Sequence, residues 1–167
     1  MPFQAPADGV LLPPYRILDL TGPEGVFCGK LLADYGADVV KIEPPGGDAA
    51  RQRPPFIRDQ PGPERSSYFL FYNTNKKSVT LDLESSQGQD LFKKMVATAD
   101  VVIESFPVGY MQSLGLEFDS LKTANPGLVM ASITPFGQTG PWKDYKSSDL
   151  ISLAASGFMQ ITGDPDG

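Results

Sequence analysis

Short apolar runs recur along this chain, separated by stretches in which apolar residues have helical spacing. The runs are rich in β-branched residues and bounded by turn residues, which predicts strands. They lie at residues 15–20, 38–43, 76–83, 100–106 and 128–133. Helices are predicted at residues 26–37, 85–99, 120–127 and 148–163. This alternation is typical of an α/β fold, with a mostly parallel sheet and helices on both faces.

The spacing within each helix predicts which side chains face the core. The expected apolar faces are Val26, Leu31, Leu32 and Tyr35 in the first helix, Leu91, Met95 and Val96 in the second, and Leu150, Leu153, Ala154 and Phe158 in the last. Between residues 44 and 67 the chain is rich in Pro, Gly and Arg. A connection of this length in a compact domain is either functional or mobile.

Gly- or Pro-bearing loops follow four of the predicted strands. In open α/β sheets, ligands bind outside the carboxyl ends of the strands. The sequence therefore predicts a ligand site in the loops Leu20–Gly25, Glu43–Gly47, Ser105–Gly109 and Thr134–Gly140.

Composition excludes several classes of protein and of chemistry. The 167 residues carry a net charge of −6, which argues against a broad nucleic-acid-binding face. The basic pairs Lys76–Lys77 and Lys93–Lys94 are interpreted first as solvated surface. No apolar run approaches the roughly 20 residues that span a membrane, and the N-terminus lacks a signal-peptide pattern. With a single cysteine, a cytoplasmic protein is expected. The absence of histidine rules out Ser-His-Asp and Cys-His nucleophiles within the chain and leaves no set of zinc ligands.

Several individual residues allow more than one functional interpretation. Gly22, Gly25 and Gly29 do not have the G-x-G-x-x-G spacing of a dinucleotide site, so an NAD-dependent oxidoreductase is disfavoured. The helix start there could still receive an anion. Cys28 is expected to be a packing residue rather than a reactive thiol. Trp142 could be an aromatic platform or could fix its loop to the core. On physical grounds alone Asp149 is a first-turn helix carboxylate.

A series of ordered motifs resembles one known family. They include ILDLT, LLADYGADVVKIEPPGGDAAR, NTNKKSVTLDLESSQG, ADVVIESFPVGYMQSLGL, NPGLVMASITPFGQTGP and SDLISLAASGFMQITGDPDG. The chain resembles the N-terminal part of the family III CoA-transferases, the CaiB/BaiF group, which includes formyl-CoA transferase and alpha-methylacyl-CoA racemase. The resemblance implies an N-terminal extension (1–14) and a partial Rossmann-like, CoA-binding large domain (15–167). It also implies a second domain outside this chain and an interlocked homodimer.

The same resemblance implies transfer of CoA from an acyl-CoA to a carboxylic acid. An aspartate attacks the thioester and forms a mixed anhydride, a mechanism that needs neither histidine, metal nor a permanently bound cofactor. Coenzyme A is then a substrate. The positions expected to contact CoA are Glu24, Gly25, Leu81, Asp82, Leu83, Glu84, Ser105, Phe106, Pro107, Lys146, Ser147 and Ser148, with Asp149 in a supporting role near the thioester.

Departures from the family pattern refine this expectation. The racemase branch has a histidine before the aspartate that aligns with Asp149, whereas this chain has Ser148, so a transferase is favoured over a racemase. Basic residues of some relatives are replaced by Pro44, Glu84 and Ser113, with Arg51, Arg53 and Lys146 as possible substitutes for contacts with the CoA phosphates. The nucleophilic aspartate is expected beyond Gly167. The 167 residues are therefore expected to be incomplete and inactive alone, and a non-catalytic CoA-binding subunit that needs a partner chain is the alternative.

Overall fold

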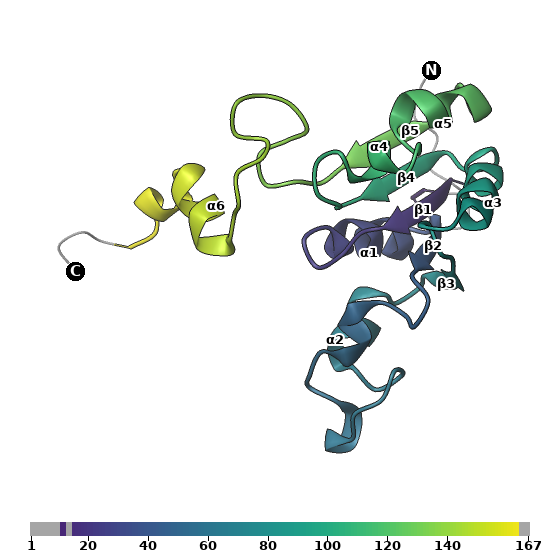
Figure 1. Cartoon of the computed structure of the whole chain (residues 1–167). Coiled ribbons are helices and arrows are strands. Elements are labelled where there is room, and N and C mark those ends of the chain that lie inside the picture. The colour runs from purple at the N-terminus through teal and green to yellow at the C-terminus, as the bar shows by residue number, and fades with distance from the viewer. Residues whose placement is uncertain (1–10, 13–14, 164–167) are drawn as a thin grey trace.

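A five-stranded parallel sheet forms the centre of the molecule (Figure 1). The computed structural model of the chain describes residues 11, 12 and 15–163. The strands run in the order β3-β2-β1-β4-β5. They are β1 (Arg16–Leu20), β2 (Asp38–Glu43), β3 (Lys77–Thr80), β4 (Val101–Glu104) and β5 (Val129–Ser132). All five predicted strands are confirmed, as is the α/β fold class, whereas most of the predicted N-terminal extension lies outside the described residues.

Two apolar layers cover the sheet, one on each face. Alternate residues of β1 enter different layers: Ile17 packs with residues of helix α1, and Leu18 packs with residues of helices α3 and α5. The helices are α1 (Val26–Asp34), α2 (Ser67–Tyr72), α3 (Ser86–Val96), α4 (Tyr110–Ser113), α5 (Phe118–Ala124) and α6 (Asp149–Ala155), with 3-10 helices η1 (Ala49–Gln52), η2 (Ile57–Asp59) and η3 (Phe158–Ile161).

The chain order creates a switch point in the sheet. From β1 the chain adds β2 and then β3 on one side, and it then crosses over to add β4 and β5 on the other side. The carboxyl ends of β1 and β4 are neighbours, with Leu20 opposite Glu104 in the parallel register. The loops after these two strands therefore diverge at the edge where α/β sheets bind ligands.

Two predicted helix faces are wrong in part. Helix α1 buries Val26, Gly29 and Ala33, whereas Leu31 and Tyr35 are exposed. The helix packs through its small residues, which allow a close approach to the sheet. In α3 the buried side chains are Phe92 and Val96, and the predicted Leu91 is exposed.

The predicted C-terminal helix is shorter than expected. It ends at Ala155, because Gly157 adopts a positive φ of 76° and a separate turn, η3, follows. Helix α6 buries none of its residues against the rest of the described chain, and Leu150 and Phe158 are both more than half exposed. The predicted apolar face of this segment is therefore not packed, and α6 stands away from the sheet (Figure 1).

Candidate ligand site at the carboxyl edge of the sheet

Of the hollows at the carboxyl ends of the strands, two adjacent ones contain most of the residues predicted to contact CoA. The first, here called the switch-point cleft, has a volume of about 600 Å³. It is lined by the loops after β1, β4 and β5 and includes Glu24, Ser105, Phe106, Pro107, Thr134 and Lys146. Five of the residues predicted to contact CoA therefore come together here, although they derive from three separate stretches of sequence.

The second hollow lies toward β3 and has a volume of about 410 Å³. Its lining is largely apolar and includes Leu20, Pro44, Pro45, Leu81, Leu83 and Tyr110. Asp82 and Glu84 also line it, so all four residues of the predicted 81–84 contact reach this β3-side hollow. Burial, together with the nearby Glu84, raises the pKa of Tyr110.

Phe106 belongs to both hollows and connects them. Its ring packs on the ring of Tyr110, with 4.6 Å between the centroids. The backbone N–H of Phe106 donates to Glu104 Oε2 at 2.7 Å, which fixes the turn after β4. A long ligand that crosses the edge of the sheet would contact this ring in both hollows.

A hydrogen bond across the switch point ties the two central loops together. The N–H of Gly22, just after β1, donates to Ser105 Oγ, just after β4, at 2.7 Å. The side chain of Ser105 is thus occupied by the protein and shapes the floor of the cleft.

Gly25 is required by a close approach at the start of α1. A Cβ at this position would lie 2.8 Å from Thr21 Cγ2 and 3.0 Å from Ile133 Cδ1, closer than real side chains pack. Gly25 therefore lets the start of α1 come against the loop after β5, which explains this glycine without a dinucleotide fingerprint.

Comparison with known proteins identifies the family. Residues 12–167 match the sequence model of CoA-transferase family III. The chain belongs to this family. It is 41% identical over 149 residues to succinyl-CoA:(R)-benzylsuccinate CoA-transferase subunit BbsE of Thauera aromatica, covering 89% of this chain and 36% of that protein. It is 46% identical over 146 residues to succinate–glutarate CoA-transferase of Agrobacterium fabrum, covering 86% and 36%.

Solved structures agree with the sequence comparison. A CaiB/BaiF family protein from Brucella suis superposes with a TM-score of 0.83 at 40% identity, over 92% of this chain and 41% of that one. Rv3272 from Mycobacterium tuberculosis superposes with a TM-score of 0.80 at 39% identity, over 93% and 43%. The chain thus spans about two fifths of the length of its relatives.

The KSSD segment of this family III chain is divided by the structure. Lys146 lines the switch-point cleft, but Ser147, Ser148 and Asp149 line neither hollow. Ser148 is the N-cap of α6 and accepts from the N–H of Ile151 at 3.4 Å, and Asp149 is in the first helical turn. The capping geometry confirms the structural interpretation of Asp149, and a contact of these three residues with CoA stays a prediction.

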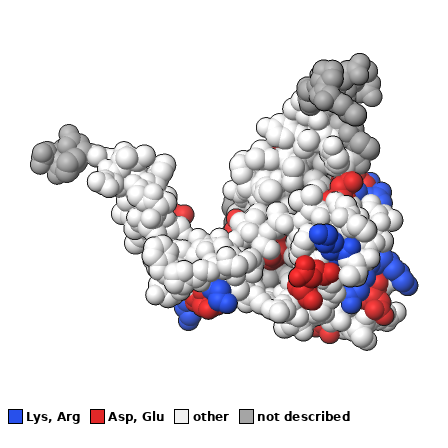
Figure 2. Space-filling model, turned by 90° about the horizontal axis from the view of Figure 1, so that it is seen from above, with Lys and Arg blue, Asp and Glu red and all other residues white. Residues whose placement is uncertain are grey.

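Free positive charge at the cleft comes from two lysines. Lys143 and Lys146 both line it, and neither forms an ion pair with another residue in the described part of the chain. Figure 2 shows that acidic and basic side chains are intermixed on the face seen there, with no broad basic surface. Glu24 and Asp144 line the same cleft, so any attraction for an anion depends on where the two ammonium groups lie and not on an excess of positive charge.

Arg51 is already neutralised within the protein. Its guanidinium makes a bidentate pair with Glu43, at 2.6 and 2.7 Å, contacts Glu64 at 2.7 Å and lies over the ring of Phe69. Burial alone would raise the pKa of Glu43, but hydrogen bonds from Arg51 and others outweigh it and lower the pKa to about 2. The sequence-based suggestion that Arg51 meets a phosphate is not supported by this geometry.

A second set of buried charges was missed from the sequence. Lys76 was expected on the surface, but its side chain is 1% exposed and pairs at 2.7 Å with Asp19, which is 0% exposed. Lys41, in β2, is also buried and pairs with Asp48 at 2.8 Å. Charged residues inside the apolar runs ILDL and VVKIE were the available signal, because strands of a parallel sheet are covered on both faces.

Cys28 and Trp142 have ordinary packing roles. Cys28 is half-buried against the α1 layer, and burial, together with the Asp19 carboxylate, raises the pKa of its thiol. This agrees with a packing residue rather than a reactive thiol. Trp142 is 57% exposed and contacts Phe136 edge to face, with 6.3 Å between ring centroids, so it packs within its own loop.

No group of three or more acidic or cysteine side chains in residues 11, 12 and 15–163 is placed to hold a metal ion. In the same part of the chain, no helix is long and apolar enough to span a membrane.

Proposed function

We propose that this carboxyl edge binds coenzyme A in an acyl-CoA:carboxylate CoA-transferase. The observation that carries the proposal is the pair of hollows that meet at Phe106. CoA is long, with an aromatic adenine at one end and a thioester at the other. The apolar β3-side hollow suits the adenine, and the switch-point cleft suits the pantetheine arm and thioester. Lys143 and Lys146 offer unpaired charge to the phosphates or to a substrate carboxylate.

The proposed reaction begins with attack by a carboxylate oxygen on the thioester carbonyl carbon. The C–S bond breaks, CoA leaves as a thiolate, and a mixed anhydride remains. The CoA thiolate attacks the aspartyl carbonyl carbon of this anhydride and releases the donor acid as a carboxylate. The acceptor carboxylate displaces CoA from the resulting aspartyl thioester, and the thiolate then attacks the acceptor's carbonyl carbon in the new anhydride, which forms the product thioester and frees the aspartate. The nucleophile is proposed to be an aspartate beyond Gly167, with Asp149 in a supporting role. The names of two relatives specify succinate or succinyl-CoA, which supports a short acyl-CoA as the donor. A cytoplasmic, interlocked homodimer is part of the same proposal.

Calorimetric titration with CoA, acetyl-CoA and succinyl-CoA tests the site directly, with NADH as the comparison ligand. Saturable binding of the CoA compounds and none of NADH is the expected result. Replacing Lys146 by Ala should weaken CoA binding about fivefold, the size of one screened charge contact of about 1 kcal/mol. Lys94→Ala, an exposed lysine on α3 outside both hollows, is the matched control. Binding of NADH in place of CoA would favour an oxidoreductase.

A CoA-binding subunit that needs a partner chain is the second candidate. It is favoured by one observation, that the relative BbsE is named as a subunit. Turnover separates the two candidates. CoA affinity with no transfer of CoA from succinyl-CoA to any carboxylic acid, gained when a second chain is added, would favour the subunit.

A further inference from the structure

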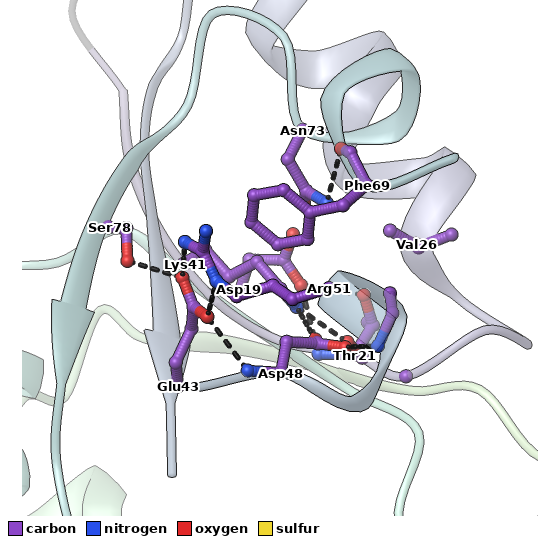
Figure 3. Close-up of polar contacts among 12 residues, drawn as sticks. Asp19, Thr21, Val26, Lys41, Glu43, Asp48, Arg51, Phe69, Asn73 and Ser78 are labelled. Carbon is purple, nitrogen blue, oxygen red and sulfur yellow. Dashed lines mark hydrogen bonds and ion pairs between the residues drawn. The ribbon is translucent and has the colours of Figure 1, made fainter. Parts of the chain in front are cut away.

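The loop formed by residues 21–25 lines the switch-point cleft through Glu24. Its first residue, Thr21, is hydrogen-bonded to buried charged side chains (Figure 3). Asp19 is the penultimate residue of β1, and both of its carboxylate oxygens accept hydrogen bonds. Its Oδ1 accepts from the N–H of Thr21 at 2.9 Å and from the Thr21 hydroxyl at 2.6 Å. Its Oδ2 accepts from Lys76 at 2.7 Å. The orientation of this carboxylate is therefore fixed by the donors on both of its sides.

Lys76 is just as fully engaged. Besides Asp19, its ammonium group donates to Asn73 Oδ1 at 3.0 Å and to the carbonyl of Val26, in the first turn of α1, at 3.3 Å. Lys76 lies at the end of the long connection between β2 and β3. This connection projects from the sheet and carries α2 (Figure 1), and its last residues thus reach the base of the β1–α1 loop.

Thr21 is the residue on which these contacts converge. Lys41 donates to the carbonyl of Thr21 at 2.9 Å, so the N–H, the hydroxyl and the carbonyl of this one residue are all bonded to buried charges. The next residue, Gly22, bonds to Ser105 across the switch point. A chain of contacts therefore runs from the buried charges to the floor of the cleft.

A buried ion pair rarely stabilises a fold more than apolar residues of the same size would, because both charges lose their hydration. What such a pair does provide is a fixed geometry, since an alternative packing would leave a charge without a partner. We infer that Asp19, Lys41 and Lys76 are positioning residues for the loop 21–25, and that they hold it in the shape that receives CoA. The second half of this inference rests on the proposed function.

Two variants and two measurements test the inference. Lys76→Met removes the ammonium group but keeps most of the side chain, and Asp19→Asn/Lys76→Met removes both charges while leaving an acceptor for Thr21. Val39→Ala, a truncation in the apolar layer of β2 that keeps every charge and every hydrogen bond of Asp19, Lys41 and Lys76, is the control for lost stability. Hydrogen exchange of residues 20–26 is measured without ligand, and CoA affinity is measured by calorimetry.

The expected result is faster exchange of residues 20–26 in both charge variants, by about tenfold beyond the change in α3. CoA affinity should fall by a similar factor, about tenfold. Val39→Ala should change exchange in both segments alike. If residues 20–26 and α3 respond equally to the charge variants, the positioning role is wrong. If the loop loosens but CoA binds as in the unmodified chain, the link to the ligand is wrong. If even the unmodified chain fails to bind CoA, the proposed function fails, and the exchange data still decide the positioning role. If Lys76→Met does not fold, the double variant decides.

Discussion

Gly29 provides the sharpest test of the buried ion pair. It lies inside α1, where replacing glycine by alanine ordinarily adds about 1 kcal/mol of helix stability. Here, however, an alanine Cβ would overlap Asp19 Oδ2 and would lie 2.9 Å from Asp19 Cγ and 3.0 Å from Lys76 Nζ. Both side chains are buried, so neither can move aside into solvent.

The cost of Gly29→Ala follows from these contacts. Overpacking of a buried site costs about 1–3 kcal/mol, and loss of a buried pair about 3–5 kcal/mol. Because the pair can shift partly without breaking, and because the helix gains propensity, we expect a net loss of about 3 kcal/mol in the free energy of unfolding. With a urea dependence of about 2 kcal/mol per M, the unfolding midpoint should fall by roughly 1.5 M.

Urea unfolding followed by far-UV circular dichroism measures this shift. Gly127→Ala is the matched control, because its Cβ would meet only Asn125 Oδ1 at an ordinary 3.6 Å, so its midpoint should barely change. A Gly29→Ala protein as stable as the unmodified chain, or more stable, would refute the reasoning. It would mean that Asp19 and Lys76 do not occupy the space beside the helix.

Three further predictions concern single side chains. Because the pKa of Glu43 is lowered in the folded state to about 2, its stabilisation is complete above the unfolded-state pKa and is lost as the pH falls toward 2. Between pH 5 and pH 2, thermal unfolding should show that the free energy of unfolding falls by about 3 kcal/mol because of this group, and Glu43→Gln should remove that fall. If the free energy of unfolding of Glu43→Gln depends on pH as strongly as that of the unmodified chain, the lowered pKa of Glu43 is wrong. Because the pKa of Cys28 is raised, the rate of thiol labelling should increase at a higher pH in the folded chain than in the chain unfolded in guanidinium. If the labelling rates of the folded and unfolded chains depend on pH in the same way, Cys28 is not buried. Ser105→Ala leaves the Gly22 N–H without its acceptor, so exchange of that amide should speed up about fivefold, a loss of about 1 kcal/mol, and an unaltered rate counts against the tie between the loops.

The strands were predictable because of where they lie. A parallel strand is covered on both faces, so its sequence is mostly apolar, as in β4, where Val101, Val102 and Ile103 follow one another. The gathering of these loops at one edge was predictable for a related reason, since parallel strands bring all their following loops to one side. Glu24 and Ser105, 81 residues apart in the chain, could therefore be placed at one edge from sequence alone.

The buried faces of the helices were harder to predict, because a search for apolar spacing selects large apolar side chains. Helix α1 contacts the sheet through Gly29 and Ala33, which a hydrophobic pattern undervalues, and leaves Leu31 exposed. The two halves of the Lys76–Lys77 pair also illustrate the limit. The Lys76 side chain is buried against Asp19, whereas the Lys77 side chain is 72% exposed and pairs with Asp38. The two lysines are identical in sequence terms, and tertiary contacts alone decide which of their side chains is buried.

Three buried carboxylates at the carboxyl edge of the sheet bear on where the proposed reaction can take place. Glu43 and Glu104 end β2 and β4, Asp19 is the penultimate residue of β1 between them, and each is at most 2% exposed. Each accepts a backbone N–H from the segment that follows its own strand, donated by Thr21, Asp48 and Phe106 respectively.

A nucleophilic carboxylate must present an oxygen to the thioester, whereas the oxygens of these side chains accept hydrogen bonds from the protein itself. Both oxygens of Asp19 and both of Glu43 accept hydrogen bonds from donors within the protein, and Glu104 holds the turn that positions Phe106. These three acids therefore shape the loops of the site, and the attacking carboxylate of the proposed reaction has to come from another position in the protein.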